Sequence, residues 1–216
     1  KLDLNYAMQI SWGLDYIEPI EIPSYISNLF AIFWLVGITN AFNWLDGIDG
    51  LASGISLLIS VPLCILSFSG SIPSLFVLPL VLGGSCAGFL KDNLITKKIL
   101  MGDGGSYLLG FSIAAISLVS IPELFSPKNL IIPIFIIFVP LIDMARVIIL
   151  RLLDRISPFY PDRKHIHYLL IDQGIELKNT LYVLYMFSIS TSLFGLGLLH
   201  NENFKLLSSI SLLILI

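Results

Sequence analysis

Long uncharged stretches dominate the chain, and short polar segments separate them. A membrane-spanning helix needs about 20 mostly apolar residues, and the chain supplies six such stretches before a further one begins near its C-terminus. A segment rich in Ser, Gly and Pro at 67–74 divides the longest stretch into two spans. The predicted spans are 25–43, 51–67, 74–90, 104–122, 129–150 and 179–199, followed by an incomplete span at 204–216.

The composition agrees with this pattern. Of 216 residues, 56% are hydrophobic and only 12% are charged, against about 25% in soluble domains, and the mean hydropathy is +0.91. We therefore predict an all-α, polytopic transmembrane helical bundle of six to seven spans. It forms a single membrane-embedded domain over residues 1–216, which we expect to be truncated at both ends, with the polar residues 1–21 at the membrane interface.

Charge orients the predicted bundle. The polar loops at 46–49, 91–103 and 151–178 share one side and, with the adjoining Arg146, hold nine of the 12 lysines and arginines, whereas the opposite loops hold only Lys128. Positive residues mark the cytoplasmic side, so the first set of loops is expected to face the cytoplasm. The net charge of −3 predicts no nucleic-acid partner.

Amide and carboxylate side chains recur every third residue where the first span meets the cytoplasm. They are Asn40, Asn43, Asp46 and Asp49, and residues three apart are neighbours on a helix surface. A capping turn is the structural alternative, although a cap needs only one such residue. Because ionisable residues at a membrane boundary usually handle ions or substrates, we predict part of a site here.

A glycine-rich segment, Met-Gly-Asp-Gly-Gly-Ser, runs from Met101 to Ser106 before the fourth span, with Asn93 and two lysines upstream. Glycines, a carboxylate and a hydroxyl before a helix suit a bound phosphate. Asp103 could hold Mg²⁺, which takes one or two carboxylates together with substrate phosphates. The Gly-Lys-Ser/Thr ending of a P-loop is absent, and a plain turn between helices would look similar.

The longest polar loop carries Pro-Asp-Arg-Lys-His-Ile-His at 161–167. Arg163 can grip a phosphate or carboxylate in a fork, and His165 and His167 can act as acid or base or donate to an anion. The structural alternative is a basic loop that faces anionic lipid headgroups. In the fifth span, Asp143 and Arg146 are three residues apart and are predicted to pair with each other.

These clusters share one face and favour phosphoryl transfer, which needs a metal, cations and a positioned nucleophile. A membrane location predicts a lipid as one substrate.

The three motifs, taken in order over residues 30–180, resemble the polyprenyl-phosphate N-acetylhexosamine-1-phosphate transferases of glycosyltransferase family 4. The Pro-Asp-Arg-x-His-Ile-His form is similar to the branch that transfers GlcNAc-1-phosphate from a UDP-sugar to undecaprenyl phosphate and releases UMP, to start cell-envelope glycans such as lipopolysaccharide. Alternatives are a phospho-MurNAc-pentapeptide translocase-type transferase, a non-catalytic homologue or a transporter.

The resemblance also implies roles for individual residues. It implies Mg²⁺ as cofactor, with Mn²⁺ as the alternative, on Asn43 and Asp103. It implies a bacterial inner-membrane enzyme whose site faces the cytoplasm, with a UDP-N-acetylhexosamine as donor and undecaprenyl phosphate as acceptor. It also implies an Asp-Asp pair upstream of Lys1. Whether the enzyme is a homodimer stays open. The expected catalytic residues are Asp46, Asp49, Asp103, His165 and His167, and the expected substrate-binding residues are Asn40, Asn43, Asn93, Ser106 and Arg163.

Two positions depart from the family pattern. The family usually has a third histidine where this chain has Tyr168, and an aromatic residue where it has Leu100. Both positions bear on recognition of the sugar and the uracil.

Overall fold

The computed structural model describes residues 7–8, 20–21, 23–70, 73–120, 127–158 and 160–198. A short antiparallel ribbon pairs β1 (Ala7–Met8) with β2 (Ile20–Glu21), and the rest of the regular structure is helical, as predicted. The helices are, in chain order, α1 (Ser24–Leu45), α2 (Leu51–Ser69), η1 (Pro73–Phe76), α3 (Val77–Leu90), η2 (Lys91–Ile95), α4 (Gly102–Ser120), α5 (Pro127–Ile136), α6 (Phe138–Leu153), α7 (Ile166–Asp172) and α8 (Leu177–Gly197).

The chain is a multi-pass membrane protein. Five helical segments in the described part are long and apolar enough to cross a membrane, and a bent pair of helices makes a sixth if it is counted as one span. The five segments are Ser24–Leu45, Leu51–Ser69, Pro73–Ile95, Gly102–Ser120 and Leu177–Gly197. The predicted span at 204–216 lies outside the described residues, as does most of 1–21.

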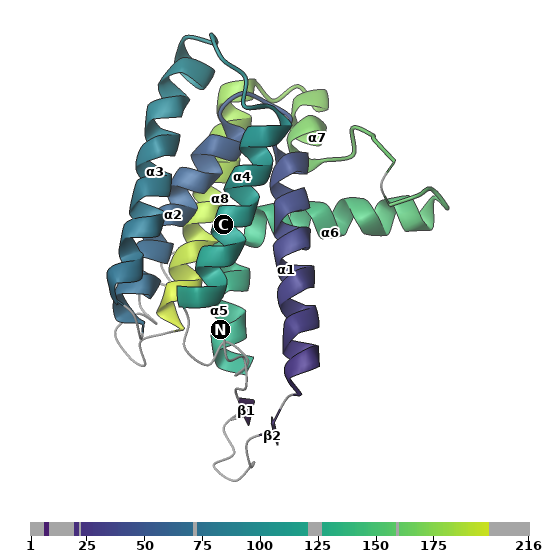
Figure 1. The fold of residues 1–216 in the computed structure, drawn as a ribbon. Helices are drawn as coiled ribbons and strands as arrows, with labels where there is room; N and C mark the ends of the chain where they lie inside the picture. Colours follow the sequence, from purple (N-terminus) through teal and green to yellow (C-terminus); the bar gives the residue numbers. More distant parts are fainter. Residues whose placement is uncertain are drawn as a thin grey trace.

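The helix α2 forms the centre of the bundle. It packs against α3, α4 and α8, and its residues Ile55, Ile59 and Leu63 are fully buried. Figure 1 shows α1, α2, α3, α4 and α8 running side by side. Apolar side chains such as Phe33 and Phe111 remain exposed on the outside, as expected where lipid is the solvent.

The pair α1 and α4 makes a very close crossing. A Cβ atom added to Gly110 would lie 2.7 Å from the Cα of Thr39 and 2.9 Å from the carbonyl oxygen of Ile38. The indole of Trp34 also donates a 2.9 Å hydrogen bond to the hydroxyl of Ser117 across the same pair. Only glycine permits this backbone approach, and the contact holds α1 and α4 in register.

The predicted fifth span is broken into two helices, and the break lies earlier than predicted. The chain bends by 86° between Leu130–Ile136 and Phe138–Leu153, and α6 leaves the bundle sideways (Figure 1). Pro140 explains the break, because it has no N–H for the carbonyl of Ile136 and its ring would clash with that carbonyl in a continuous helix. The interruption therefore comes at Ile137 and not near the charged residues farther along.

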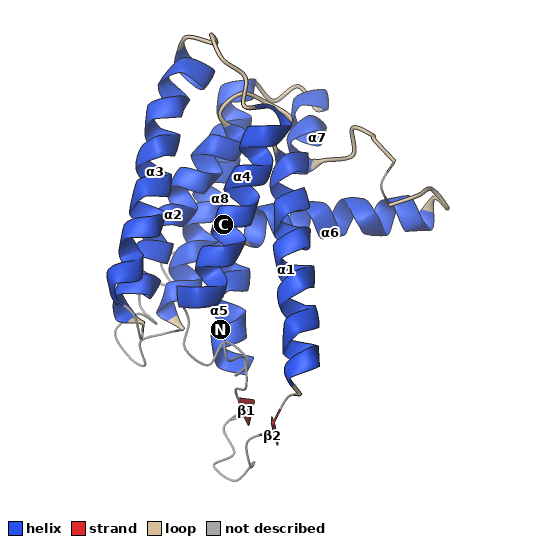
Figure 2. Ribbon diagram, in the orientation of Figure 1, coloured by secondary structure: helices blue, strands red, loops and turns tan. Residues whose placement is uncertain are grey.

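Loops and helix ends gather at the upper end of the bundle, where Figure 2 shows most of the connecting loops in tan. The end of α1, the starts of α2, α4 and α8, and the short helix α7 meet there (Figure 1). This end holds all three sequence motifs, so the prediction that they share one side of the bundle is confirmed.

The close crossing generates a stability prediction. We expect Gly110→Ala to lower the free energy of unfolding by about 1–3 kcal/mol, because the methyl group overpacks the backbone of α1. The matched control is Gly84→Ala in α3, where an added Cβ meets nothing within 4 Å, and it should leave stability unchanged or slightly higher. Unfolding in detergent measures both, and equal losses would contradict the role of the crossing.

Candidate functional site

The first motif closes α1 and forms the turn to α2. The backbone N–H of Asp46 donates to the carbonyl oxygens of Phe42 and Asn43, which ends the helix. Gly50 then starts α2 with φ of +85°, a left-handed conformation that glycine adopts without strain. The side chains of Asp46 and Asp49 are thus placed on a tight turn at the end of the bundle.

The first and second motifs meet directly. The Asn43 amide donates 3.1 Å hydrogen bonds to Oδ1 of Asp103 and to Oγ of Ser106. Gly110 and Thr39, which make the close crossing, lie one helical turn away on α4 and α1. Asn40 stays apart, because its amide donates to the carbonyl of Val36 on its own helix.

A cavity of about 480 Å³ lies at this junction. Three carboxylates from two different segments of the chain face it. Its lining residues are Asp46, Gly47, Ile48, Asp49, Asn93, Leu100, Met101, Gly102, Asp103 and Leu177.

The cavity is strongly acidic. Burial, together with the negative charges of Asp49 and Asp103, raises the pKa of Asp46 to about 6. Within the described ranges, no lysine or arginine forms an ion pair with any of the three. The site therefore favours either a bound cation or protonation of one of the three carboxylates.

A magnesium ion fits this donor set. No group of three or more His, Cys, Asp or Glu side chains is arranged as a metal cage in the described part of the chain. Mg²⁺ does not need one, since it usually binds one or two carboxylates and completes its shell with water and substrate phosphates. Asp103, exposed and held by Asn43, has the chemistry expected of such a ligand.

Asn93, predicted to bind substrate, is buried and engaged in the fold. Its Oδ1 accepts a 2.7 Å bond from the backbone N–H of Gly50, and its Nδ2 donates to the carbonyl of Ile99 at 3.0 Å. A longer 3.4 Å contact runs from Nδ2 to Oδ1 of Asp49. Asn93 lines the cavity, and it also ties the aspartate turn to the loop before α4.

The Pro-Asp-Arg loop is anchored by Arg151, which sequence reasoning did not single out. Arg151 is 2% exposed, and its guanidinium forms a two-pronged ion pair with Asp162 at 2.9 and 3.1 Å. It also donates to the carbonyl of Pro158 and stacks 4.9 Å from the ring of Trp44. The pair with Arg151 lowers the pKa of the Asp162 carboxyl. Asp162 is therefore engaged in holding the loop against α6, whose Arg151 in turn contacts Trp44 of α1.

Arg163, His165 and His167 lie beside the cavity and do not line it. Arg163 is exposed, pairs with Asp172 at 3.4 Å and stacks over the ring of Tyr168. His165 and His167 are buried, with ring centroids 5.7 Å apart. Both ring nitrogens of His167 lack a hydrogen-bond partner.

Two tyrosines and a carboxylate complete the surroundings of the turn. Tyr168 donates to the carbonyl of Gly47 at 3.2 Å, and Tyr185 of α8 donates to the carbonyl of Gly50 at 2.6 Å. Asp143 binds His165 and the backbone of Ile166, while Arg146 donates to the carbonyl of Lys164. The predicted pairing of Asp143 with Arg146 was wrong, because each reaches a loop that helical spacing does not reveal.

The fold and this site define a multi-pass membrane protein with an acidic, metal-compatible cavity at one end of its bundle. A profile described as glycosyl transferase family 4 matches residues 6–121. The chain belongs to this family.

Curated relatives agree with the family assignment. The chain is 39% identical over 163 residues to the "Probable undecaprenyl-phosphate N-acetylglucosaminyl 1-phosphate transferase" of Bacillus subtilis (strain 168), covering 74% of this chain and 46% of the relative. Enzymes named "Undecaprenyl-phosphate alpha-N-acetylglucosaminyl 1-phosphate transferase" are 35% identical in Thermotoga maritima, with 80% and 52% covered, and in Escherichia coli (strain K12), with 71% and 42% covered. The chain spans about half the length of these relatives.

The bonds of Asn93 generate a prediction. We expect Asn93→Ala to lower the free energy of unfolding by roughly 1–3 kcal/mol, because the buried N–H of Gly50 loses its partner. Asn40→Ala removes the same amide from a bond within α1 and should cost clearly less. Unfolding in detergent compares the two variants, and an equal cost would show that Asn93 does not tie the turn.

The buried ring of His167 predicts an acid-sensitive fold. Burial lowers its pKa from 6.5 to about 4, so the unfolded chain binds this proton more readily than the folded one. The free energy of unfolding is therefore highest, as far as His167 is concerned, above about pH 6.5, and it decreases by roughly 3 kcal/mol as the pH falls toward 4. His167→Phe keeps a ring and cannot titrate, so unfolding of the variant should lack this pH dependence. An unchanged pH dependence would contradict the prediction.

Proposed function

We propose that the intact protein transfers an N-acetylhexosamine-1-phosphate, with GlcNAc-1-phosphate as the first choice, from a UDP-sugar to undecaprenyl phosphate. One observation carries the proposal: Asn43, Asp46, Asp49 and Asp103 meet at one acidic cavity at the end of a membrane bundle. The names of the relatives support the lipid acceptor and the sugar phosphate.

In the proposed reaction, an oxygen of the lipid phosphate attacks the β-phosphorus of the UDP-sugar. A new bond forms between that oxygen and the β-phosphorus, the bond from the β-phosphorus to the bridging oxygen breaks, and UMP leaves with the electron pair. The lipid phosphate is already largely ionised at neutral pH, since phosphate monoesters have a second pKa of about 6. The attack therefore does not require a strong protein base.

The cavity residues have distinct proposed roles. Asn43 and Asp103 would hold Mg²⁺, or Mn²⁺ in its place, which when bound would supply charge stabilisation for the diphosphate. Asp46, whose pKa is raised to about 6, can hold or release a proton near neutral pH. Asp49 and Asn93 shape the wall on the side of the Gly50 turn, while Ser106 keeps Asn43 oriented.

Arg163 is the proposed group for the sugar diphosphate, because its guanidinium is exposed beside Tyr168 at the edge of the turn. His165 and His167 are buried and stacked on each other, and His167 packs against Gly47 of the turn. The exposed Leu100 takes the place in the lining where the family has an aromatic ring.

The site is proposed to face the cytoplasm of a bacterial inner membrane. Lys91 begins η2, and Lys97 and Lys98 lie in the loop between η2 and α4, at the end that carries the cavity. Positive residues favour the cytoplasmic side. A water-soluble UDP-sugar would reach the cavity from that side, and the lipid phosphate would reach it from the adjoining bilayer.

Isotope transfer tests the proposal. Membranes containing the intact protein, UDP-GlcNAc labelled in the sugar and Mg²⁺ are expected to yield a labelled lipid and UMP, and chelation of the metal should stop the reaction. Asp103→Asn should lower turnover roughly 100-fold or more, as loss of a preorganised electrostatic group does. Asp92→Asn is the matched control, because Asp92 is half-buried, bonds to Thr96 and does not line the cavity.

Two results would overturn this reading. Absence of labelled lipid with the unaltered protein would favour a non-catalytic homologue that binds lipid. Full turnover by Asp103→Asn would remove the acidic cavity from the reaction even if the transfer itself occurs.

A further inference from the structure

A buried carboxylate stands outside the cavity and has no part in the roles given above. Asp143 lies on α6, two turns after the bend, and is 2% exposed. One of its oxygens accepts from or shares a proton with Nδ1 of His165 at 2.7 Å, and the other accepts the backbone N–H of Ile166, also at 2.7 Å. Both oxygens are thus committed to the point where α7 begins.

The charge of Asp143 is directed at His165. Arg146, on the same helix, donates instead to the carbonyl of Lys164, and His165 is the partner in the ion pair that Asp143 makes within the described residues. A carboxylate bonded to one ring nitrogen fixes the proton there and determines which nitrogen is left over. Asp143 therefore sets both the tautomer and the orientation of His165.

From His165, contacts continue to the cavity. Its ring lies 5.7 Å from that of His167, nearly parallel at 15°, and its other neighbour is Trp44 at 5.8 Å. His167 in turn packs against Gly47, where an added Cβ would come within 2.1 Å of Nε2. Gly47 follows Asp46 and lines the cavity.

We propose that Asp143 is a positioning residue for the transfer reaction. It acts through His165, and the stacked rings of His165 and His167 brace Gly47, so that the turn bearing Asp46 and Asp49 keeps its place in the cavity wall. The kinetic test of this inference rests on the proposed function. The structural test, which locates the proton on His165, is independent of the proposed function.

The substitution Asp143→Asn separates charge from shape. The amide oxygen can still accept the N–H of Ile166, but the NH₂ group now faces Nδ1 of His165, which must give up its proton to accept. We expect kcat/KM for UDP-GlcNAc to fall about 10- to 100-fold, as when a group that orients a functional histidine is lost. Asp154→Asn is the matched control, since Asp154 is an exposed carboxylate at the end of α6 that pairs with Lys164, and kcat/KM should stay unchanged.

A double-mutant cycle then asks whether the effect passes through His165. If it does, adding Asp143→Asn to His165→Gln causes little further loss of kcat/KM, whereas a purely structural role lowers both backgrounds by the same factor. Nitrogen NMR of the histidine-labelled intact protein, assigned with His165→Gln, is expected to show the His165 proton on Nδ1 and its loss from Nδ1 in Asp143→Asn.

The outcomes are distinct. Wild-type kcat/KM in Asp143→Asn, equal losses in both backgrounds, or a His165 proton found only on Nε2 in the unaltered protein would each overturn the inference and leave the proposed transfer intact. If the unaltered protein makes no labelled lipid, the proposed function fails, and the proton position on His165 still decides whether Asp143 orients that ring.

Discussion

The close crossing of α1 and α4 is the constraint on which the site depends. Gly110 lets the two backbones approach, and one turn farther along Asn43 reaches Asp103 and Ser106. Residues sixty positions apart are thereby joined. Because the crossing also brings Asp103 near Asp46, burial and like charge together raise the pKa of Asp46, and the cavity becomes a place where a cation is stabilised.

A second set of side chains holds the backbone of the site. Asn93 accepts from the N–H of Gly50, Tyr185 and Tyr168 donate to the carbonyls of Gly50 and Gly47, and Asp143 accepts from the N–H of Ile166. Irregular backbone at a membrane boundary needs such partners, since a buried polar group without one is costly. Several polar residues near the cavity thus hold the backbone of the turn in place, in addition to any contact that they make with a ligand.

Much of this could be predicted from the sequence. The bilayer demands long apolar stretches, so most spans were found, and charge and spacing grouped the motifs at one end. The bend at Ile137 was not foreseen, because prolines are also tolerated in continuous membrane helices. The partners of Asp143 and Arg151 were missed as well. Helical spacing reports neighbours within one element, whereas Asp143 and Arg151 bind residues of the following loop.

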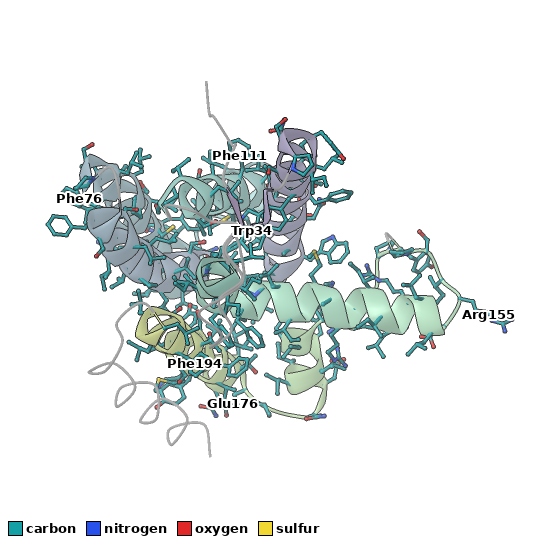
Figure 3. All side chains as sticks on the ribbon, turned by 90° about the horizontal axis from the view of Figure 1, so that it is seen from below. Trp34, Phe76, Phe111, Arg155, Glu176 and Phe194 are labelled. Carbon is teal, nitrogen blue, oxygen red and sulfur yellow. The ribbon has the colours of Figure 1, made fainter. Side chains whose placement is uncertain are left out.

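The sideways course of α6 restricts how the chain can change in length. From this helix, Asp143 binds His165 and Arg151 binds Asp162, both in the loop that follows. One residue added between Ile137 and Asp143 would turn Asp143 by about 100° around the helix axis, away from its partner. Arg155, by contrast, stands at the outer end of α6 and away from the bundle (Figure 3). Insertions and deletions in this family should therefore collect at that outer tip and be excluded from the stretch that joins the bend to Arg151.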